Sequence, residues 1–266
     1  MTQLPKSRRD ALSTMSFALA AGGLFATTPA AIAFPLRSST SSRIRAIAFD
    51  AFVLFSPRPI VLRARAIAGD KADTLVAAAS EKLFGYTWYY TSAGHYAEFD
   101  ELARTAFESA AGNLGLKLTG GELDELVSGY ANLALWPDVR AALEVLRAGG
   151  VRLAILSNLS EQTLWANLRA GGVDDLFEFV LSTDRVRQFK PSPRAYDQAV
   201  SAFRVPAYEI GFAASASWDA SGATWFGFPT VWVNRSHQPA DHAHTAAILE
   251  SSGMDGILKL AAIGAA

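Results

Sequence analysis

The sequence predicts an α/β protein with a doubly wound parallel sheet and an inserted helical cap domain. Two observations support this fold class. After residue 136, short apolar runs alternate with segments of helical periodicity, and this βαβα order is typical of parallel sheets with right-handed crossovers. From about residue 57 to 135 the pattern is helical throughout, which indicates an insertion between the first strand and the rest of the sheet.

The first strand is predicted over residues 44–49, where an apolar run ends on a single carboxylate, Asp50. Four or more apolar residues in a row are typical of a central parallel strand, which is buried on both faces. Open α/β sheets bind ligands beyond the carboxyl ends of their strands. Asp50 is therefore placed where chemistry is expected.

The insertion shows an alanine-rich helical stretch over 64–82 and apolar residues at three- and four-residue spacing over 96–114 and 121–133. Thr119 and Glu122 fit a capping box. After the insertion the order of elements is regular. Helices are predicted over 139–148, 161–170, 193–203 and 221–225, and strands over 151–156, 179–181, 210–213 and 230–233.

Composition narrows the class of protein. Of the 266 residues, 50% are hydrophobic, which is enough for a large core, and the net charge of −1 gives no basic surface for nucleic acid. Cysteine is absent, which excludes disulfides, thiol catalysis and cysteine-bound metals.

Residues 1–33 are predicted to be an export signal. Basic residues precede an apolar stretch over 12–26, and Ala31-Ile32-Ala33 fits a cleavage site. Ser7-Arg8-Arg9-Asp10-Ala11-Leu12 resembles a twin-arginine signal. A mature protein in the periplasm or secreted, with no membrane segment, is therefore expected. We predict a linker over 34–42, a core made of 43–56 and 136–266, and a cap over 57–135.

Polar side chains follow several of the predicted strands: Asp50, Ser157-Asn158, Lys190 and Asp219. Because adjacent strand ends converge on one crevice, we expect these groups to lie together. A lysine between two acids favours their charged forms. One carboxylate can then attack as a nucleophile while the other orients water.

In order, the segments that carry these groups resemble the four motifs of the haloacid dehalogenase superfamily: Phe49-Asp50-Ala51-Phe52, Leu156-Ser157-Asn158, Lys190-Pro191 and Trp218-Asp219-Ala220. The L-2-haloacid dehalogenase branch is more similar still, with matches at Tyr86-Thr87-Trp88, at 181–186, at Tyr196, and at 226–235. The resemblance covers about residues 43–235.

The resemblance implies a metal-free hydrolase without a cofactor. Asp50 attacks C2 of a short 2-halocarboxylate with inversion, and water oriented by Asp219 and Lys190 hydrolyses the resulting ester. Ser157 and Asn158 bind the substrate carboxylate, and Tyr196 hydrogen-bonds within the charged cluster. Phe52, Phe99 and Trp218 belong to the substrate-binding residues. The family also implies a homodimer formed through cap helices.

A phosphatase reading is disfavoured, because superfamily phosphatases carry a second aspartate where this chain has Phe52. Phenylalanine cannot protonate a leaving group, and the Trp218-Asp219-Ala220 segment offers one hard oxygen ligand where magnesium needs several. A second cluster, His237, Asp241, His242 and His244, is predicted to be a solvated loop and not a metal site.

The chain also departs from the family. Leu54, Ser80, Ala214 and Ala216 stand where relatives carry polar or charged residues, among them the cap arginine that receives the halide. Arg58, Arg63 and Arg65 are candidate replacements, with Arg58 assigned to substrate binding. Two alternatives therefore stay open: a superfamily hydrolase acting on another small carboxylate or a phosphate ester, and a secreted binding protein that has lost catalysis.

Overall fold

The computed structural model describes residues 44–239 and 249–263. The predicted export signal, the linker, and three residues of the histidine-containing loop (Asp241, His242 and His244) lie outside these ranges. Within the described ranges, no helix is long and apolar enough to cross a membrane.

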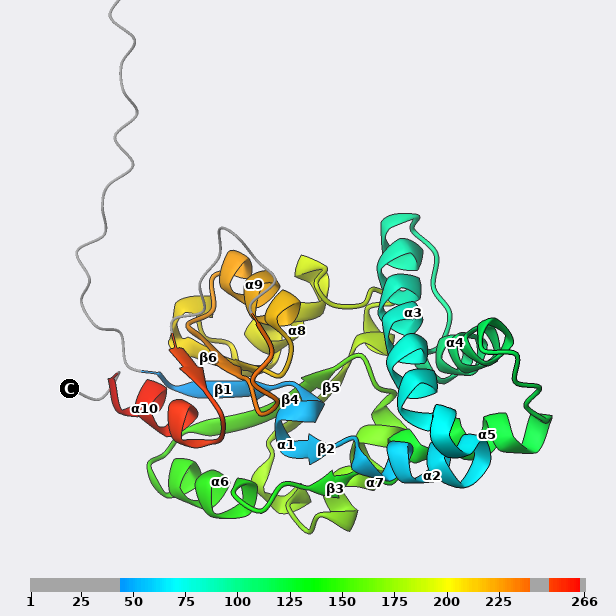
Figure 1. The fold of residues 1–266 in the computed structure, drawn as a ribbon. Coiled ribbons are helices and arrows are strands. Elements are labelled where there is room, and N and C mark those ends of the chain that lie inside the picture. The colour runs from blue at the N-terminus through cyan, green and yellow to red at the C-terminus, as the bar shows by residue number, and fades with distance from the viewer. Residues whose placement is uncertain (1–43, 240–248, 264–266) are drawn as a thin grey trace, which may run out of the picture. The chain divides into compact units, whose positions relative to one another are not determined.

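The core is a six-stranded parallel sheet in the order β5-β4-β1-β6-β7-β8 (Figure 1). The strands are β1 (Ala46–Phe49), β4 (Arg152–Ser157), β5 (Phe179–Ser182), β6 (Ile210–Ala214), β7 (Thr230–Val233) and β8 (Leu249–Ser251). The predicted fold class is confirmed. β1 lies between β4 and β6, so the carboxyl ends of these three strands open on the same edge.

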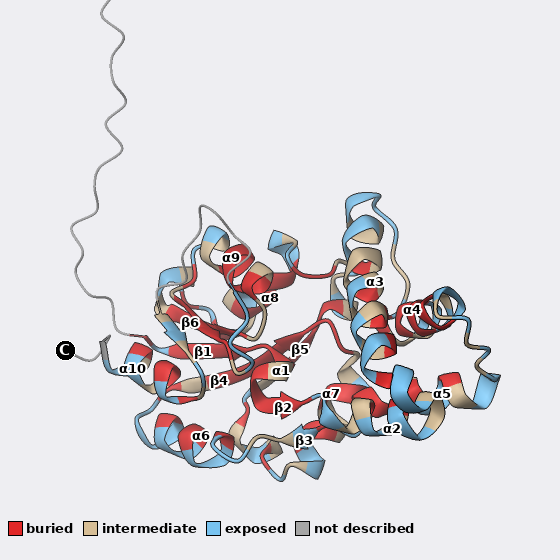
Figure 2. Ribbon diagram, in the orientation of Figure 1, coloured by how far each residue is buried: buried red, intermediate tan, exposed pale blue. Residues whose placement is uncertain are grey.

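Side chains alternate between the two faces of the sheet. On β1, Ile47 and Phe49 belong to one apolar cluster, while Ala46 and Ala48 belong to the other. Helices α8 (Pro193–Phe203) and α9 (Ser217–Phe226) cover the alanine face, and α6 (Val139–Ala148), α7 (Glu161–Ala170) and α10 (Asp255–Ile263) cover the opposite face. Both faces are therefore buried, as Figure 2 shows, which explains the uninterrupted apolar run of the first strand.

The inserted helices lie between two short strands, β2 (Phe55–Ser56) and β3 (Ala134–Leu135), which pair antiparallel. Between them run α2 (Arg58–Ala68), α3 (Ala72–Ser92), α4 (Phe99–Asn113) and α5 (Gly120–Ser128). The capping box before α5 is confirmed. The Thr119 hydroxyl accepts from the Glu122 N–H (3.3 Å), and the Thr119 N–H donates to the Glu122 carboxylate (2.7 Å).

Asn167 of α7 joins these helices to the core. Its side-chain amide donates to the carbonyl of Tyr130 (2.8 Å) and accepts from the N–H of Leu133 (2.9 Å), and the side chain is fully buried. Tyr130 and Leu133 lie just before β3, where the chain returns from the insertion. One amide therefore satisfies two backbone groups at the junction.

Several predicted boundaries are corrected. The helical stretch predicted over 64–82 spans two helices, because Gly69 ends α2 with a positive φ of 55°, which suits glycine. α9 begins four residues earlier than predicted, at Ser217, because its first turn mixes polar and apolar residues and shows no clear periodicity. The four-residue helix α1 (Ala51–Leu54), β8 and α10 were not predicted. β8 is short and contains Glu250, so no apolar run marks it.

Candidate active site

Asp50 is held by the start of the element that follows its strand. It is the N-cap residue of α1, and its Oδ2 accepts from the backbone N–H of Phe52 (3.1 Å). The carboxylate is almost completely buried. An N-cap side chain bends back over the first turn of its helix, so the local sequence fixes the orientation of the acid.

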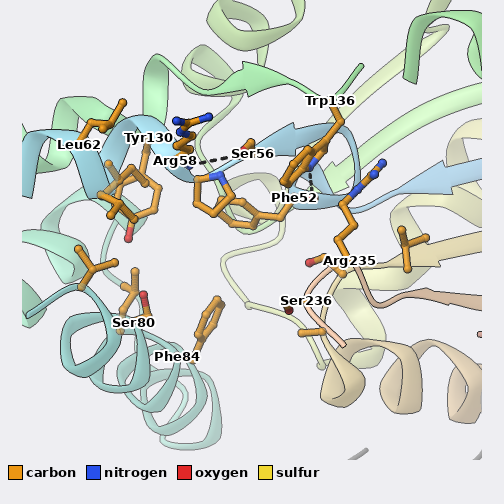
Figure 3. A pocket seen from close by; sticks show the side chains of 18 of the residues that line it. Phe52, Ser56, Arg58, Leu62, Ser80, Phe84, Tyr130, Trp136, Arg235 and Ser236 are labelled. Carbon is orange, nitrogen blue, oxygen red and sulfur yellow. Dashed lines mark hydrogen bonds between the residues drawn. The ribbon is translucent and has the colours of Figure 1, made fainter. Parts of the chain in front are cut away.

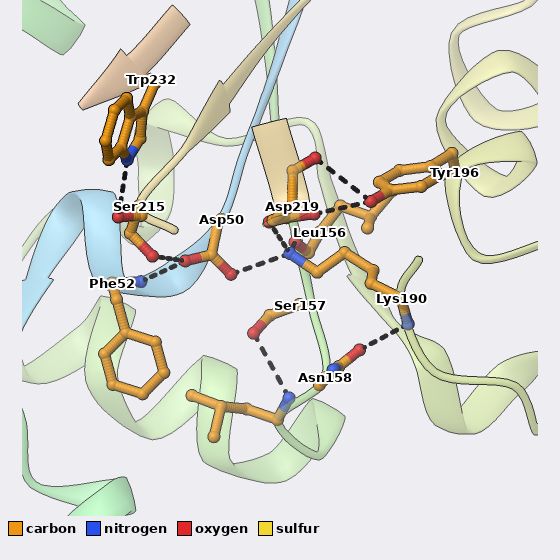
Figure 4. A network of polar contacts seen from close by, with 11 residues as sticks. Asp50, Phe52, Leu156, Ser157, Asn158, Lys190, Tyr196, Ser215, Asp219 and Trp232 are labelled. Atoms are coloured by element: carbon orange, nitrogen blue, oxygen red, sulfur yellow. Dashed lines mark hydrogen bonds and ion pairs between the residues drawn. The ribbon is translucent and has the colours of Figure 1, made fainter. Parts of the chain in front are cut away.

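Lys190 lies between the two acids (Figure 4). Its Nζ donates to Asp50 Oδ1 (2.8 Å), to Asp219 Oδ2 (2.7 Å) and to the carbonyl of Leu156 (3.3 Å). An ammonium has three donors, and each one finds an acceptor. Burial alone would lower the pKa of Lys190, but the charges of Asp219 and Asp50 raise it above its usual value. The ammonium is therefore charged at neutral pH.

Asp219 lies in the first turn of α9 and does not cap it, because Ala216 is the N-cap residue. Its Oδ1 accepts from the hydroxyl of Tyr196 (2.7 Å). Burial and the nearby charge of Asp50 outweigh the ammonium of Lys190 and the Tyr196 hydroxyl, and raise the pKa of Asp219 to about 6. The carboxyl is thus mostly ionised at pH 7 and close to the range in which a general base works well.

Tyr196 supports Asp219 from behind. The ring is fully buried, and the side chain lines neither of the two cavities near the acids. Burial raises the pKa of the Tyr196 hydroxyl well above its usual value, so this group stays a neutral donor. The Tyr196 hydroxyl therefore contacts Asp219, and the side chain does not reach the cleft beside Asp50.

Ser215 was missed by sequence reasoning. Its hydroxyl donates to Asp50 Oδ2 at 2.6 Å, the shortest of the hydrogen bonds described here for Asp50. The motif comparison drew attention to Ala214 and Ala216, the residues on either side. A usable signal was present, because a hydroxyl directly after β6 lies at the strand end beside β1.

Ser157 and Asn158 follow β4 at the same edge. The Ser157 hydroxyl accepts from the N–H of Leu159 (3.3 Å), and Asn158 Oδ1 accepts from the backbone N–H of Lys190 (2.9 Å), which fixes the lysine loop. Asn158 Nδ2 is buried and has no partner. A buried donor without a partner carries a desolvation cost that a bound anion would remove.

These groups surround one cleft of about 20 Å³. Eight of its lining residues were predicted from the sequence: Asp50, Phe52, Phe99, Ser157, Asn158, Lys190, Trp218 and Asp219. Phe84 and Phe99 reach the cleft from the inserted helices. Phe84 and Trp88 of α3 pack against the Trp218 ring, each at 5.4 Å between ring centroids, so the insertion covers the site.

Arg58 does not line this cleft. It lies in a larger adjoining cavity, together with Ser80 and Arg65. Arg65 is paired with Asp73 (3.2 Å), and Arg63 donates to the carbonyl of Pro59 (3.5 Å). Among the described residues, no arginine lines the cleft beside Asp50, so a halide-binding role for Arg58 stays a prediction.

The donor set does not suit magnesium. The ammonium of Lys190 already occupies the space between the two carboxylates, and Phe52 stands at the position of a second acid. Within the described ranges, no group of three or more acidic or histidine side chains could hold a metal ion. Magnesium needs several hard oxygen ligands in octahedral geometry, and this cleft does not supply them.

A buried carboxylate at a strand end, paired with a lysine and facing a second acid of raised pKa, is an arrangement that supports nucleophilic catalysis by an aspartate in a hydrolase. A family model described as haloacid dehalogenase-like hydrolase matches residues 31–227. The chain belongs to this family.

Curated relatives narrow the comparison. The chain is 32% identical over 222 residues to haloacetate dehalogenase H-2 from Moraxella sp. (strain B), covering 83% of this chain and 99% of that protein. It is 34% identical over 194 residues to (S)-2-haloacid dehalogenase from Pseudomonas sp. (strain YL), covering 73% of this chain and 84% of that protein.

Solved structures agree in fold. A crystal structure of an L-2-haloacid dehalogenase superposes with a TM-score of 0.80 at 35% identity, covering 83% of this chain and 100% of that one. The enzyme from Xanthobacter autotrophicus with chloropropionic acid covalently bound superposes with a TM-score of 0.75 at 25% identity, covering 82% of this chain and 98% of that one.

Proposed function

We propose that this protein is a hydrolase acting on carbon–halide bonds, which dehalogenates 2-haloalkanoic acids through an ester on Asp50. The observation that carries the proposal is the Asp50–Lys190–Asp219 cluster in a cleft that aromatic side chains close on one side. Similarity to (S)-2-haloacid dehalogenases over most of the chain supports the same reaction.

In the first half-reaction, Asp50 displaces halide from C2. Oδ2 accepts two hydrogen bonds, from Ser215 and from the Phe52 N–H, and Oδ1 accepts one, from Lys190, so we assign the attack to Oδ1. Attack from the side opposite the halide forms the C2–O bond, breaks the C2–halogen bond and inverts C2. Asn158 Nδ2 and the Ser157 hydroxyl are the buried donors available to the substrate anion.

In the second half-reaction, water adds to the carbonyl carbon of the ester. Asp219 takes the proton of the water, and negative charge develops on Oδ2. The hydroxyl of Ser215 and the N–H of Phe52 already point at that oxygen, and such preorganised donors stabilise an oxyanion. The bond between Oδ1 and the carboxyl carbon of Asp50 then breaks. The 2-hydroxy acid therefore leaves with Oδ1 of Asp50 as its hydroxyl oxygen.

Halide release from L-2-chloropropionate in the presence of EDTA tests this function. Oxygen isotope tracing tests the route: a single turnover in ¹⁸O water should give an unlabelled hydroxyl in the product and label in Asp50. Asp50→Asn should abolish turnover. Label that enters the product directly, or turnover that persists in Asp50→Asn, would contradict the covalent route.

The phosphate alternative is separated by a second assay. Magnesium-dependent hydrolysis of p-nitrophenyl phosphate, without halide release, would favour a diverged phosphohydrolase. Absence of both activities, with an intact fold, would favour the binding-protein alternative.

We also propose export to the periplasm or secretion. The basic start, the apolar stretch and Ala31-Ile32-Ala33 support this. Cell fractionation with Arg8→Lys/Arg9→Lys as the comparison tests it: the parent chain should leave the cytosol with Phe34 as its first residue, and the double variant should not. Cytosolic, uncleaved protein in both cases would contradict export. A homodimer through cap helices stays a prediction, which light scattering would test.

A further inference from the structure

A second, larger cavity opens directly from the cleft. Its volume is about 550 Å³, and the two cavities share lining residues: Phe52, Phe84, Phe99, Ser215 and Ala216. Figure 3 shows the space between α3, which carries Ser80 and Phe84, and the segment that carries Phe52, Ser56 and Arg58. We call this space the side chamber.

The walls of the side chamber are mainly apolar. Ile60, Val61 and Leu62 of α2 face Val76 and Leu83 of α3 across it. Two of the cations that line it are already paired. Arg65 binds Asp73 (3.2 Å), and Arg235 binds Asp138 (2.9 Å) with its guanidinium 4.7 Å from the Trp136 ring centroid.

The cleft beside Asp50 is too small for an alkyl chain. About 20 Å³ is room for roughly one or two water molecules. A 2-halo acid is larger than this space, so part of the substrate must extend into the adjoining cavity. The side chamber lies within the size range of small-molecule sites, about 300–1,000 Å³, and is far larger than a methyl group needs. The exposed Leu62 extends its apolar surface towards solvent.

We propose that the side chamber receives the alkyl chain of the substrate, and that the preferred substrates are 2-halogenated acids with apolar chains longer than that of propionate. This inference rests on the proposed function. Ser80 is the residue that makes it specific to this chain, because a short side chain in the middle of α3 leaves the chamber open between Val76 and Phe84.

The specificity constant for bromide release should rise along the series 2-bromopropanoate, 2-bromobutanoate and 2-bromohexanoate. Each methylene that enters the chamber should add about fourfold, which gives about 60-fold between the first and the last. Val76→Phe and, independently, Ser80→Leu should flatten this rise. Ala77→Phe, on the exposed side of the same helix, should leave it unchanged. A flat or falling series in the parent enzyme would overturn the proposal.

Binding measurements test the side-chamber proposal separately from the proposed dehalogenase activity. Calorimetry with butanoate, hexanoate and octanoate should show dissociation constants that fall with chain length in the parent and in Ala77→Phe, but not in Val76→Phe. If this is seen without bromide release, the chamber stands and the dehalogenase function fails. If affinity does not depend on chain length, the chamber proposal is wrong even where bromide is released.

Discussion

Replacing Ser215 by alanine removes the hydroxyl that donates to Asp50 Oδ2 at 2.6 Å. A hydrogen bond to a charged group contributes about 1.5–3 kcal/mol. Since about 1.36 kcal/mol corresponds to a tenfold change in rate, we expect kcat/KM for a 2-bromo acid to fall by about 10- to 160-fold. The backbone N–H of Phe52 remains on the same oxygen, so activity should not disappear.

The same variant distinguishes two roles for the hydroxyl. If Ser215 stabilises the oxyanion during ester hydrolysis, the ester on Asp50 should accumulate in Ser215→Ala, and mass spectrometry of quenched protein should detect it. If Ser215 only orients Asp50 for attack, formation of the ester should slow and no ester should accumulate.

Two further variants control this experiment. Ser215→Thr keeps a hydroxyl and should recover most of the activity. Ser201→Ala alters an exposed serine of α8 that lines neither the cleft nor the side chamber, and should behave as the parent does. If Ser215→Ala retains kcat/KM within twofold while unfolding at the parent temperature, the hydroxyl has no role in catalysis.

Three other changes give sharp expectations. Lys190→Met leaves two buried carboxylates without their cation and should lower the free energy of unfolding by about 3–5 kcal/mol in urea titrations; adding Asp219→Asn should recover part of this, and no recovery would contradict the charge argument. Tyr196→Phe removes a hydrogen bond that lowers the pKa of Asp219. The acid limb of the pH profile of kcat, expected near pH 6 in the parent, should therefore move to higher pH, and a limb that stays or moves down would show that another group titrates. Asn167→Ala leaves two buried backbone groups unpaired and should cost about 2–6 kcal/mol by the same titration, and a loss below 1 kcal/mol would mean that they find other partners.

Much of the sheet and of the charged cluster could be predicted without coordinates. The first strand had to be central because its apolar run leaves no face for solvent, and Asp50 had to lie at the carboxyl edge because it follows that run. The placement of Lys190 and Asp219 near Asp50 was predictable, because the residues that follow parallel strands meet at one edge of the sheet, however far apart they lie in the sequence.

Ser215 and Asn167 show where this reasoning ends. Both make their contacts across the sheet edge or between separate parts of the fold. The position of Ser215 after β6 indicates the sheet edge but not its partner, and nothing in the local sequence of Asn167 distinguishes it from an ordinary polar residue. Ser215 is the one hydroxyl between Ala214 and Ala216, but only the folded chain shows that this hydroxyl reaches Asp50. Hydrogen-bond partners far apart in sequence depend on backbone placement within a few tenths of an ångström, which periodicity does not encode.

The sequence by itself determined the order of the main strands and helices, the insertion and the place of Asp50 at a strand end, because these follow from apolar periodicity and from residues at strand ends. Only the tertiary structure decided which side chains fill the space around that acid. The absence of Arg58 from the cleft, and the side chamber left open beside Ser80, result from how α2 and α3 pack over the sheet edge. Volume between packed elements is a property of all the neighbouring side chains together, and no single segment of the chain specifies it.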